Sequence, residues 1–374
     1  MILHLILDDK FSDYAINQFI ALDNTSEFVV LTEVQDLKLN YIKNIQAVTV
    51  ININSPDYFH FCKTINKYDA IILHGLFSFL QANIIQLLSE DVKIAWIFWG
   101  GEIYGRPDLI IDFYSFQSKL LYYFRKLKKF ITEKGSNGNM FCADISIYLR
   151  INYCLTDVHE DYEFVKKYTH SSMKELWYNY YSIEETVGSL ADQKVNSGNI
   201  LIGNSSTLEN NHLDIFRVLN RFDLSDRKII VPLSYGQTWL KRIILKKGYS
   251  QFTDSFLPLT DFLERDVYNN YILSCSIVVM NHYRPQAMGN IITALWLGAK
   301  VYLSKRSLLF AFFQRIGIHL YSVENDLKSE NKEALLPLES NKVDHNRTIL
   351  KNIYGRENMM LRIKEIVEEL KRTE

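Results

Sequence analysis

The stretch ILIGNSSTLENNHLDIFRVL, residues 200–219, contains the transition that decides the fold. Its apolar start predicts a strand over residues 199–202, and its second part predicts a helix over residues 211–222. Consecutive apolar positions are typical of strands that are buried on both faces, as in parallel sheets. A strand that runs through a short turn into a helix is the repeating unit of α/β folds, so this stretch predicts an α/β domain.

The alternation of strand and helix continues through the rest of the second half of the chain. Further strands are predicted over residues 228–232, 277–280 and 300–303. Helices are predicted over residues 238–248, 262–275 and 289–297, and a charged terminal helix over residues 348–371. Strand–helix–strand order of this kind indicates a doubly wound parallel sheet.

The first half of the chain shows the same alternation. Strand candidates lie at residues 2–7, 28–31, 47–51, 70–73, 93–99 and 151–155. Helical stretches lie between them at residues 13–22, 58–65 and 80–88. Two such halves predict two Rossmann-like, doubly wound α/β domains that face a central cleft. Ligands in these folds bind at the carboxyl ends of the strands, so the loops after the strands are the places to search for a site.

Chain length and one polar stretch set the expected domain boundaries. A chain of 374 residues is longer than one hydrophobic core usually serves. Residues 182–198 are polar and lack a strong apolar period, as a linker does. We expect an N-terminal domain over residues 1–185 and a C-terminal domain over residues 186–345. A terminal helix over residues 346–374 is expected to pack back across the domains.

Composition and charge exclude several classes of protein. The net charge of −1 provides no overall positive field for nucleic acid. The four cysteines lie far apart without CxxC spacing, which disfavours a zinc site and fits reduced thiols in the cytosol. The first apolar run ends at Asp8 and Asp9, so we expect a buried strand there and not a secretory signal. Because the chain has no run of eighteen apolar residues, we expect no membrane-spanning helix.

The loop after the strand at residues 199–202 begins with Gly203, Asn204 and Ser205. Glycine lets the backbone approach a ligand closely, and free N–H groups at a helix start hold phosphate oxygens. The loop matches neither the GxGxxG fingerprint nor a Walker loop, which disfavours a Rossmann oxidoreductase or a P-loop kinase. Two interpretations stay open, a phosphate-binding loop and a plain strand-to-helix turn that Ser and Asn cap.

A second polar loop, MNHYRPQAMGN at residues 280–290, also joins a strand to a helix. Arg284 and Gln286 lie in the loop, and Gly289 and Asn290 open the helix. A guanidinium beside a helix N-terminus favours negative charge, as on a departing diphosphate. The alternative is a surface arginine followed by ordinary capping residues. Both polar loops belong to one predicted domain, as a site for a single ligand requires.

Two shorter segments support a site in the same domain. The strand candidate that ends in VPLSYG places Tyr235 in a loop, where it can contact a sugar or a phosphate. The segment DSFLPL, residues 254–259, is predicted as an apolar loop that sandwiches a nucleobase. Aromatic residues in loops more often serve packing, so each of these signals is weak.

Two candidates for acid–base chemistry follow strands in the first half. His74 opens the motif HGLF, and Glu102 lies within FWGGEIYG, between glycines and a tyrosine. A carboxylate near a hydroxyl group of a substrate is suited to act as its general base. A histidine can do the same, or it can bind the molecule that carries the hydroxyl. The alternative is that both side chains serve structure. The sequence alone does not decide between these interpretations.

The segment YSFQSKLLYYFRKLKKFITEKG, residues 114–135, predicts a basic amphipathic helix with interleaved aromatic residues. Its candidate contacts to a membrane or an acceptor are Lys119, Arg125, Lys126, Lys128 and Lys129. Such a helix suits an anionic bilayer surface, and the alternative is an ordinary solvated helix packed on the core. No DxD motif stands at a strand end, so we expect no metal ion and no cofactor, with the leaving group stabilised by Arg284 and helix N-termini.

Short motifs in a consistent order give the chain a family resemblance over most of its length. They are HGLF, FWGGEIYG, ILIGNSS, VPLSYG and RPQAMGN, which resemble HGxF, WGxDxY, a strand–GNS loop, VPxxY and RQxGxG. The family is glycosyltransferase family 56, the bacterial dTDP-4-acetamido-4,6-dideoxygalactose transferases of enterobacterial common antigen synthesis. The chain departs from these motifs at Glu102, which replaces Asp, at Pro285 and at Asn290, which replaces a Thr-like residue.

The resemblance implies a GT-B fold and a transferase that acts without a metal. The expected donor is a dTDP-activated deoxy or acetamido sugar in the C-terminal domain, and the expected acceptor is a polyprenyl-diphosphate-linked saccharide bound by the N-terminal domain. The expected location is the cytoplasmic face of a bacterial inner membrane, as a peripheral protein. Two alternatives stay open. One is a glycosyltransferase with a UDP- or GDP-sugar and a soluble acceptor, and the other is a non-catalytic protein that binds sugar nucleotides or glycans.

Overall fold

A computed structural model of the chain describes residues 1–22, 25–132, 141–224 and 226–372, with the backbone alone for residues 129–132. Their fold consists of two compact units. Unit 1 comprises Met1–Arg106, Asn139–Ser182 and Arg356–Glu374, and unit 2 comprises Pro107–Gly138 and Ile183–Gly355.

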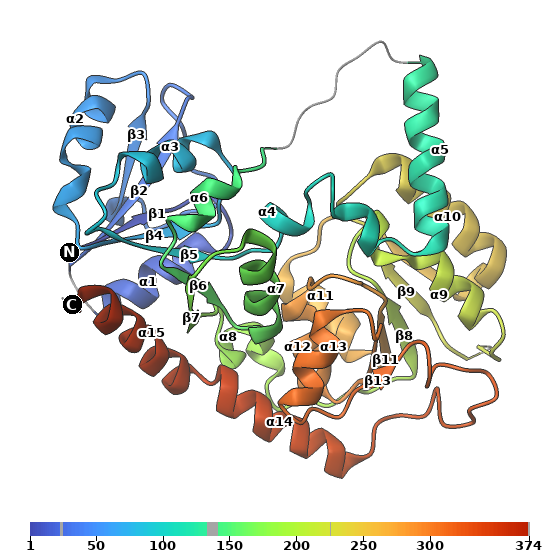
Figure 1. Cartoon of the computed structure of the whole chain (residues 1–374). Helices are drawn as coiled ribbons and strands as arrows, with labels where there is room; N and C mark the ends of the chain where they lie inside the picture. Colours follow the sequence, from blue (N-terminus) through green and yellow to red (C-terminus); the bar gives the residue numbers. More distant parts are fainter. Residues whose placement is uncertain (23–24, 133–140, 225, 373–374) are drawn as a thin grey trace. The chain divides into compact units, whose positions relative to one another are not determined.

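Unit 1 contains a seven-stranded sheet in the order β3-β2-β1-β4-β5-β6-β7, and each pair of neighbours is parallel (Figure 1). The strands are β1 (Ile2–Leu5), β2 (Ser26–Thr32), β3 (Val48–Asn52), β4 (Ala70–His74), β5 (Lys93–Ile97), β6 (Tyr153–Thr156) and β7 (Lys174–Trp177). The helices are α1 (Ser12–Leu22), α2 (Pro56–Thr64), α3 (Phe79–Leu87), α4 (Gly101–Tyr104), α6 (Ile145–Leu149), α7 (His159–Thr169) and α15 (Arg356–Lys371). The chain order doubles back between β1 and β4, as the doubly wound prediction requires.

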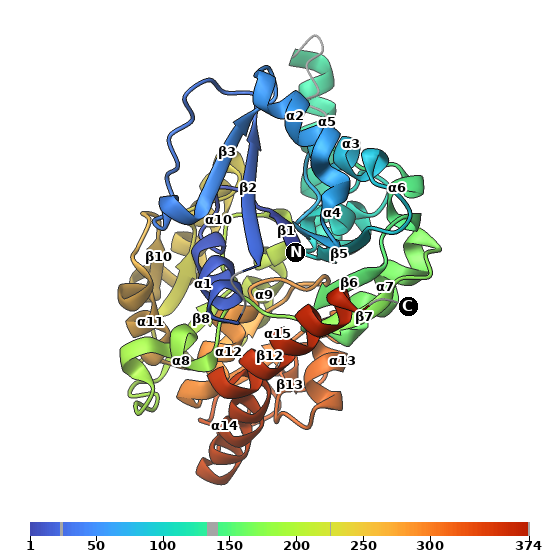
Figure 2. The same ribbon diagram turned by 90° about the vertical axis from the view of Figure 1, so that its left-hand side faces the viewer.

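The two faces of this sheet are covered by different helices. Alternate strand residues such as Ile72 and Leu155 join α1 and α15 in one buried cluster. Helices α1 and α15 lie side by side (Figure 2). Trp96 belongs to the alternate set of strand residues, and its ring lies 5.3 Å from that of Tyr148 on α6. Helices on both faces explain why the strands are apolar at consecutive positions.

Unit 2 contains a six-stranded sheet in the order β10-β9-β8-β11-β12-β13, again with parallel neighbours. The strands are β8 (Asn199–Ile202), β9 (Ile229–Pro232), β10 (Phe256–Leu259), β11 (Cys275–Met280), β12 (Lys300–Leu303) and β13 (Tyr321–Ser322). The helices are α5 (Phe116–Thr132), α8 (Ile183–Val187), α9 (His212–Leu219), α10 (Thr238–Phe252), α11 (Arg265–Leu273), α12 (Met288–Leu297), α13 (Leu308–Arg315) and α14 (Ser340–Tyr354). Two parallel sheets with helices between the strands confirm the predicted α/β class.

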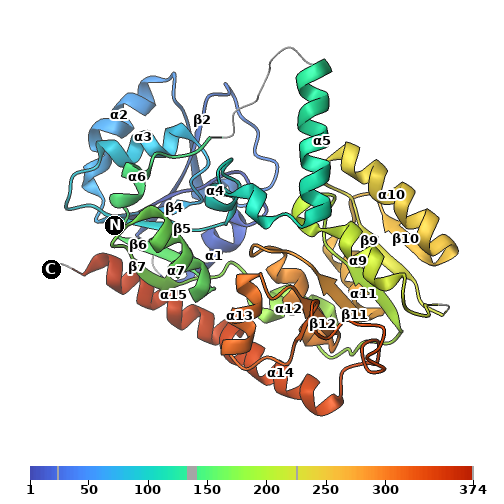
Figure 3. The ribbon, with the colours of Figure 1, turned by 45° about the vertical axis from the view of Figure 1, so that its right-hand side comes forward.

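Helices α9 and α10 and the start of α5 cover one face of the second sheet. Ile200 and Ile202 of β8 pack into the same buried cluster as Phe216 of α9 and Ile244 of α10, and Leu121 of α5 packs against its edge. Helix α5 lies beside α9, which in turn lies beside α10 (Figure 3). Contacts link α12 to α8, α11 and α14. Because Leu121 packs on this cluster, the core of unit 2 includes α5, a helix from the first half of the sequence.

The observed division differs from the expected domain boundaries in two places, the segment that contains α5 and the C-terminal helices. Residues 107–132 were expected within residues 1–185, but they belong to unit 2 because Leu121 and Tyr122 of α5 pack on its core. The single terminal helix expected over residues 348–371 is two helices, α14 in unit 2 and α15 in unit 1. Gly355 separates them with an extended backbone (ψ 141°).

Several smaller expectations were wrong in detail. Phe256–Leu259, expected within an apolar loop, forms β10, and Phe256 and Leu259 are buried. The expected linker at residues 182–198 contains α8 and a short 3-10 helix, Gly188–Leu190. The short strands β7 and β13 were not predicted, since β7 is only partly buried and β13 has two residues. Among the described residues, no helix is long and apolar enough to cross a membrane.

Candidate functional site

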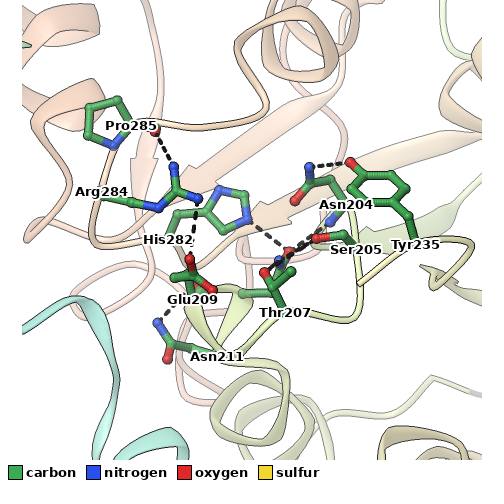
Figure 4. Close-up of polar contacts among 10 residues, drawn as sticks. Asn204, Ser205, Thr207, Glu209, Asn211, Tyr235, His282, Arg284 and Pro285 are labelled. Atoms are coloured by element: carbon green, nitrogen blue, oxygen red, sulfur yellow. Dashed lines mark hydrogen bonds and ion pairs between the residues drawn. The ribbon is translucent and has the colours of Figure 1, made fainter. Parts of the chain in front are cut away.

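The switch point of the second sheet brings together the two polar loops that the sequence singled out. Strands β8 and β11 are neighbours, although β9 and β10 come between them in the chain. After β8 the chain continues to β9 on one side of this pair, and after β11 it continues to β12 on the other side. The loops after β8 and β11 therefore diverge. Open α/β sheets bind ligands at this position, outside the carboxyl ends of the strands. The residues of the two loops are shown in Figure 4.

Gly203 permits the sharp turn that ends β8. Its φ is +65°, a left-handed conformation that favours glycine. A Cβ atom at this position would lie 2.5 Å from Oδ1 of Asn210 and 2.8 Å from Nε2 of His212. The Gly203 N–H donates to the Val279 carbonyl at 2.9 Å, which ties the turn to β11. The glycine is therefore required by close packing inside the site.

Asn210, which is fully buried, joins the two loops. Its Nδ2 donates to Ser205 Oγ at 3.0 Å and to Thr207 Oγ1 at 2.9 Å. Its Oδ1 accepts from the Asn204 N–H at 2.8 Å and lies 2.9 Å from Nε2 of His282 (Figure 4). The loop after β8 is thus held both internally and to the loop after β11.

Arg284 lies in the loop after β11 and pairs with Glu209. Its Nη2 donates to Glu209 Oε1 at 3.3 Å, and its Nη1 donates to the Pro285 carbonyl at 3.2 Å (Figure 4). The two charged side chains are 18% and 10% exposed, so water screens the pair only weakly. The structure therefore supplies a fixed guanidinium at the switch point.

Several buried polar atoms of these loops find no hydrogen-bond partner among the described residues. They are Asn204 Oδ1, His212 Nε2, His282 Nδ1, Arg284 Nε and Gln286 Nε2. Buried polar groups in native proteins are nearly always satisfied, by protein, water or ligand. A cluster of unsatisfied donors and acceptors at a switch point is what a site for a polar ligand requires.

Burial keeps the histidines of the site uncharged at neutral pH. Burial lowers the pKa of His212 to about 3. Burial, together with the positive charge of Arg284 and the neighbouring His212, lowers the pKa of His282 well below its usual range. Arg284 therefore carries the positive charge of the cluster, and each neutral imidazole offers one lone pair.

The other predicted donor-site residues lie around this cluster. Tyr235 is 57% exposed, and its hydroxyl accepts from Asn204 Nδ2 at 2.9 Å (Figure 4). Gly289 lies in the first turn of α12, where an added Cβ would meet no atom within 4 Å. Asn290, in the same turn, donates to the Tyr268 hydroxyl of α11 at 3.1 Å. Asn290 is thus engaged within the protein, and Gly289 leaves open space at the helix start.

A cavity of about 360 Å³ borders the loop after β11. Its lining includes Asn281 and Tyr283 of that loop and Arg217 and Arg221 at the α9 side, with Glu324 opposite in charge. It contains none of the five unsatisfied atoms described above. We place the candidate site at the polar cluster and not at the cavity, because the buried atoms without hydrogen-bond partners belong to the cluster.

His74, predicted as an acceptor or base residue, lies inside unit 1. Its side chain is fully buried, and burial lowers its pKa to about 3. Its Nε2 lies 3.1 Å from Nδ1 of His4, and its Nδ1 lies 3.1 Å from the hydroxyl of Tyr180. The Tyr180 oxygen also accepts from Trp99 Nε1 at 2.9 Å. Both ring nitrogens of His74 are therefore engaged, which leaves neither for a substrate in this arrangement.

Glu102, predicted as the general base, lies in the short helix α4 and is only 2% exposed. Its Oε1 accepts from the N–H groups of Leu76 and Trp99, at 3.2 and 3.3 Å, and from Trp96 Nε1 at 3.3 Å. Its Oε2 has no partner among the described residues. Burial raises the pKa of Glu102 to about 7, against the hydrogen bonds that lower it. Two backbone N–H groups and the Trp96 indole therefore hold this carboxylate in place.

Helix α5 carries the predicted basic residues in unit 2. Lys126 and Lys128 are exposed, Lys119 is half-buried, and the half-buried Arg125 guanidinium lies 5.9 Å from the ring centre of Trp239. The side chain of Lys129 lies outside the described residues. The exposed apolar residues of α5 recur at spacings of three and four and so share one face. They are Phe116, Leu120, Tyr123, Phe124 and Leu127.

The sequence missed three residues that build the site. Glu209 and Asn210 lie between β8 and α9, and His212 is the first residue of α9. They contribute the carboxylate partner of Arg284, the link between the two loops and an imidazole nitrogen without a partner among the described residues. The sequence contained an indication of these residues. The stretch TLENNHLD, residues 207–214, has more polar residues than a short strand-to-helix turn requires. The described residues include no group of three His, Cys, Asp or Glu side chains placed to hold a metal ion.

The chain has the GT-B fold, which it shares with solved glycosyltransferases. It is similar over 98% of its length to Anabaena Alr3699/HepE, solved in complex with UDP and glucose (10% identity, TM-score 0.63, 99% of that chain covered). A glycosyltransferase from Rickettsia africae matches at 12% identity and TM-score 0.66, covering 100% and 99% of the two chains. The E. coli trehalose-6-phosphate protein bound with UDP-2-fluoro glucose matches at 8% identity and TM-score 0.64 over 100% of both chains.

The family is established by sequence. The model of the family described as 4-alpha-L-fucosyltransferase, glycosyl transferase group 56, matches residues 149–352, more than half of the chain. The chain belongs to this family, as the motif order predicted, and is a glycosyltransferase.

Proposed function

We propose that the protein transfers a deoxy or acetamido sugar from a dTDP-sugar to a saccharide linked to polyprenyl diphosphate. In this proposal the donor occupies the switch point of unit 2, and the reaction takes place at the cytoplasmic face of a bacterial inner membrane. The observation that carries the proposal is the cluster of buried polar atoms without partners around Arg284. Such a cluster fits a ligand that is both anionic and rich in hydrogen-bonding groups.

Nucleotide sugars in similar folds support a donor of this class. The Anabaena protein was solved with UDP and glucose, and the E. coli protein with UDP-2-fluoro glucose. In the present chain, Arg284 would bind the diphosphate through its open Nε–H, while Gly289 at the start of α12 lets phosphate oxygens approach free N–H groups. Gly203, Asn204, Ser205, Tyr235, Gln286 and Asn290 complete the proposed donor site.

The chemistry asked of these residues is stabilisation of a leaving group. An acceptor hydroxyl oxygen forms a bond to the anomeric carbon as the bond from that carbon to the diphosphate oxygen breaks. The electron pair passes to the diphosphate, where the guanidinium and the helix dipole oppose the growing negative charge. The hydroxyl proton passes to a base, for which Glu102 is our candidate. His74, the second candidate from the sequence, could serve only if one of its two engaged ring nitrogens were released.

Helix α5 supports the membrane part of the proposal. Its exposed apolar face lies between lysines, so that Lys126 and Lys128 can reach lipid phosphates while aromatic and leucine side chains enter the interface. Ordinary solvated helices expose charges and bury their apolar face, whereas α5 also exposes an apolar face. A lipid-linked acceptor would be reached from such a surface.

The test is binding of nucleoside diphosphates to the full chain. Thermal melting is measured with dTDP, UDP, GDP and ADP, each with and without EDTA. We expect dTDP to stabilise the protein most, by about 2.7 kcal/mol at a hundred times its dissociation constant, with no effect of EDTA. Failure of all four to stabilise it would contradict the donor site.

A second candidate function keeps the same site but changes the substrates. The UDP in the similar solved structures favours a UDP-sugar donor, and this candidate combines it with a soluble acceptor. Stabilisation by UDP in preference to dTDP, together with transfer to a water-soluble saccharide, would select this candidate.

A further inference from the structure

The hydrogen bonds of Asn210 determine how the ring of His282 is held. Both hydrogens of Asn210 Nδ2 go to hydroxyl oxygens, those of Ser205 and Thr207. The backbone N–H of Asn204 is an obligatory donor, so the amide atom that it contacts must be the oxygen. This orientation leaves the amide oxygen facing His282, whose Nε2 must then carry the hydrogen. All donor and acceptor positions of the Asn210 amide are therefore used.

The same hydrogen bonds define what His282 offers to a ligand. A neutral imidazole with hydrogen on Nε2 has a lone pair on Nδ1. That Nδ1 is buried and has no partner among the described residues, and the ring is 1% exposed. It lies in the loop that also carries Arg284 and Gln286. A buried acceptor without a donor is costly unless a ligand or water supplies one.

We infer that Asn210 is a positioning residue of the donor site, which orients the loop after β8 and holds His282 with Nδ1 as an acceptor for an O–H or N–H group of the donor sugar. The inference rests on the proposed function, since it assigns a role in the same site. A phosphate oxygen has no hydrogen to give at neutral pH, which excludes the phosphates, and we assign the contact to the transferred sugar. A hydroxyl or an acetamido N–H has the required chemistry.

The first experiment tests the hydrogen position directly. Imidazole ¹⁵N spectra of the full chain, labelled at histidine, distinguish the two neutral tautomers, and the His282→Gln spectrum identifies the signals of His282 among the nine histidines. We expect a neutral ring with hydrogen on Nε2 that remains uncharged through mildly acidic pH. Hydrogen on Nδ1, or a ring that exchanges between tautomers, would overturn the inference whether or not a nucleotide binds.

The second experiment measures donor binding by the nearly isosteric variant Asn210→Asp. Aspartate keeps both acceptor contacts but loses the two hydrogens that Ser205 and Thr207 receive. We expect the dissociation constant of the nucleotide sugar to rise roughly tenfold or more, because buried groups lose their partners. The new carboxylate also favours the charged form of His282, whereas burial, Arg284 on the same loop and His212 on α9 disfavour it. Glu209, the other carboxylate of the site, is already paired with Arg284. Binding should then weaken further in acid, and adding His282→Gln should remove that pH dependence.

Asn346→Asp is the matched control. Asn346 is also fully buried in unit 2, and its amide accepts from the His319 N–H at 2.8 Å and donates to the His319 carbonyl at 3.1 Å. We expect this variant to lose stability without a change in donor affinity or in its pH dependence. Equal losses of affinity in both variants, or unchanged affinity in Asn210→Asp, would overturn the inference. Wild-type protein that binds none of the nucleotides would instead contradict the proposed function.

Discussion

The switch points of the two parallel sheets differ in how far their buried polar groups are satisfied, although Nε2 of His4 beside His74 in unit 1 also lacks a partner among the described residues. In unit 2, the loops after β8 and β11 leave buried polar atoms of Asn204, His282 and Arg284 without partners among the described residues. In unit 1, the corresponding position lies between β1 and β4. There the Asp8 carboxylate accepts from three backbone N–H groups of residues 40–42, and His74 is bonded on both nitrogens.

This difference separates residues that keep the capacity to bind a ligand from residues whose hydrogen bonds are used within the protein. In a sequence, a polar residue after a strand indicates a binding site equally well whether or not its side chain is hydrogen-bonded within the protein. The structure shows that Arg284 keeps binding capacity, whereas His74 has used both of its nitrogens. Glu102 lies between the two cases, since one oxygen accepts three hydrogen bonds and the other accepts none from the described residues.

The largest effect is expected from Arg284→Ala. Loss of the guanidinium removes a donor to the developing negative charge, so kcat should fall by about a hundredfold to a thousandfold. Steady-state transfer from labelled donor measures this. Arg217→Ala is the control, since this exposed arginine pairs only with Asp214 at 3.8 Å among the contacts described. Wild-type turnover in Arg284→Ala would remove the main support for the donor site.

Glu102→Gln separates proton transfer from positioning. Glutamine can place its single oxygen where Oε1 accepts three hydrogen bonds, so the loops should keep their structure. If Glu102 is the base, turnover falls by roughly a hundredfold or more while donor affinity changes little. Turnover close to wild type would show that the carboxylate only positions the loops.

The same variant has a defined effect on stability against pH. The pKa of Glu102 is raised from 4.5 to about 7, so the folded state retains a proton that the unfolded state releases above pH 4.5. Its contribution to stability is present below about pH 4.5 and is lost as pH rises to about 7, by a few kcal/mol. Hydrogen exchange in β4 and β5, corrected for intrinsic rates, should show this loss in wild type. A wild-type pH profile that persists unchanged in Glu102→Gln would assign it to other groups.

Two glycines allow stability and binding to be separated within unit 2. Gly203→Ala places a Cβ against Asn210 and His212 at positive φ, so both stability and nucleotide binding should fall, the former by about 1–3 kcal/mol. Gly289→Ala meets no atom within 4 Å, so stability should hold or rise by about 0.5–1 kcal/mol. Nucleotide affinity should still fall if phosphates approach Gly289, and calorimetry decides this. Unchanged affinity would move the phosphates away from the start of α12.

The smallest effect is expected from charge on α5. Reversal at Lys126 and Lys128 should weaken binding to anionic vesicles by about 1 kcal/mol per residue, and stability should not change. Co-sedimentation with vesicles that contain phosphatidylglycerol measures this. Reversal at Lys246 and Lys247, exposed on α10, is the control for net charge. Equal binding by wild type and both variants would contradict the membrane surface on α5.

The sequence was sufficient for the class of fold and for the location of the loops. Consecutive apolar positions such as those of residues 200–202 require strands buried on both faces, and this pattern is local, so a single sequence reveals it. The same locality placed Gly203 and Arg284 after strands, and the order of short motifs led to the family.

Tertiary structure alone decided which polar groups are free and where each segment packs. Whether Arg284 meets Glu209, or His74 meets Tyr180, depends on residues 75 and 106 positions away in the chain. Helix α5 lies in unit 2 because Leu121 and Tyr122 pack on apolar residues there, although the segments before and after it in the sequence belong to unit 1. Local patterns determine elements, but the partners of a buried polar or apolar group are set by contacts between distant residues, which a single sequence does not display.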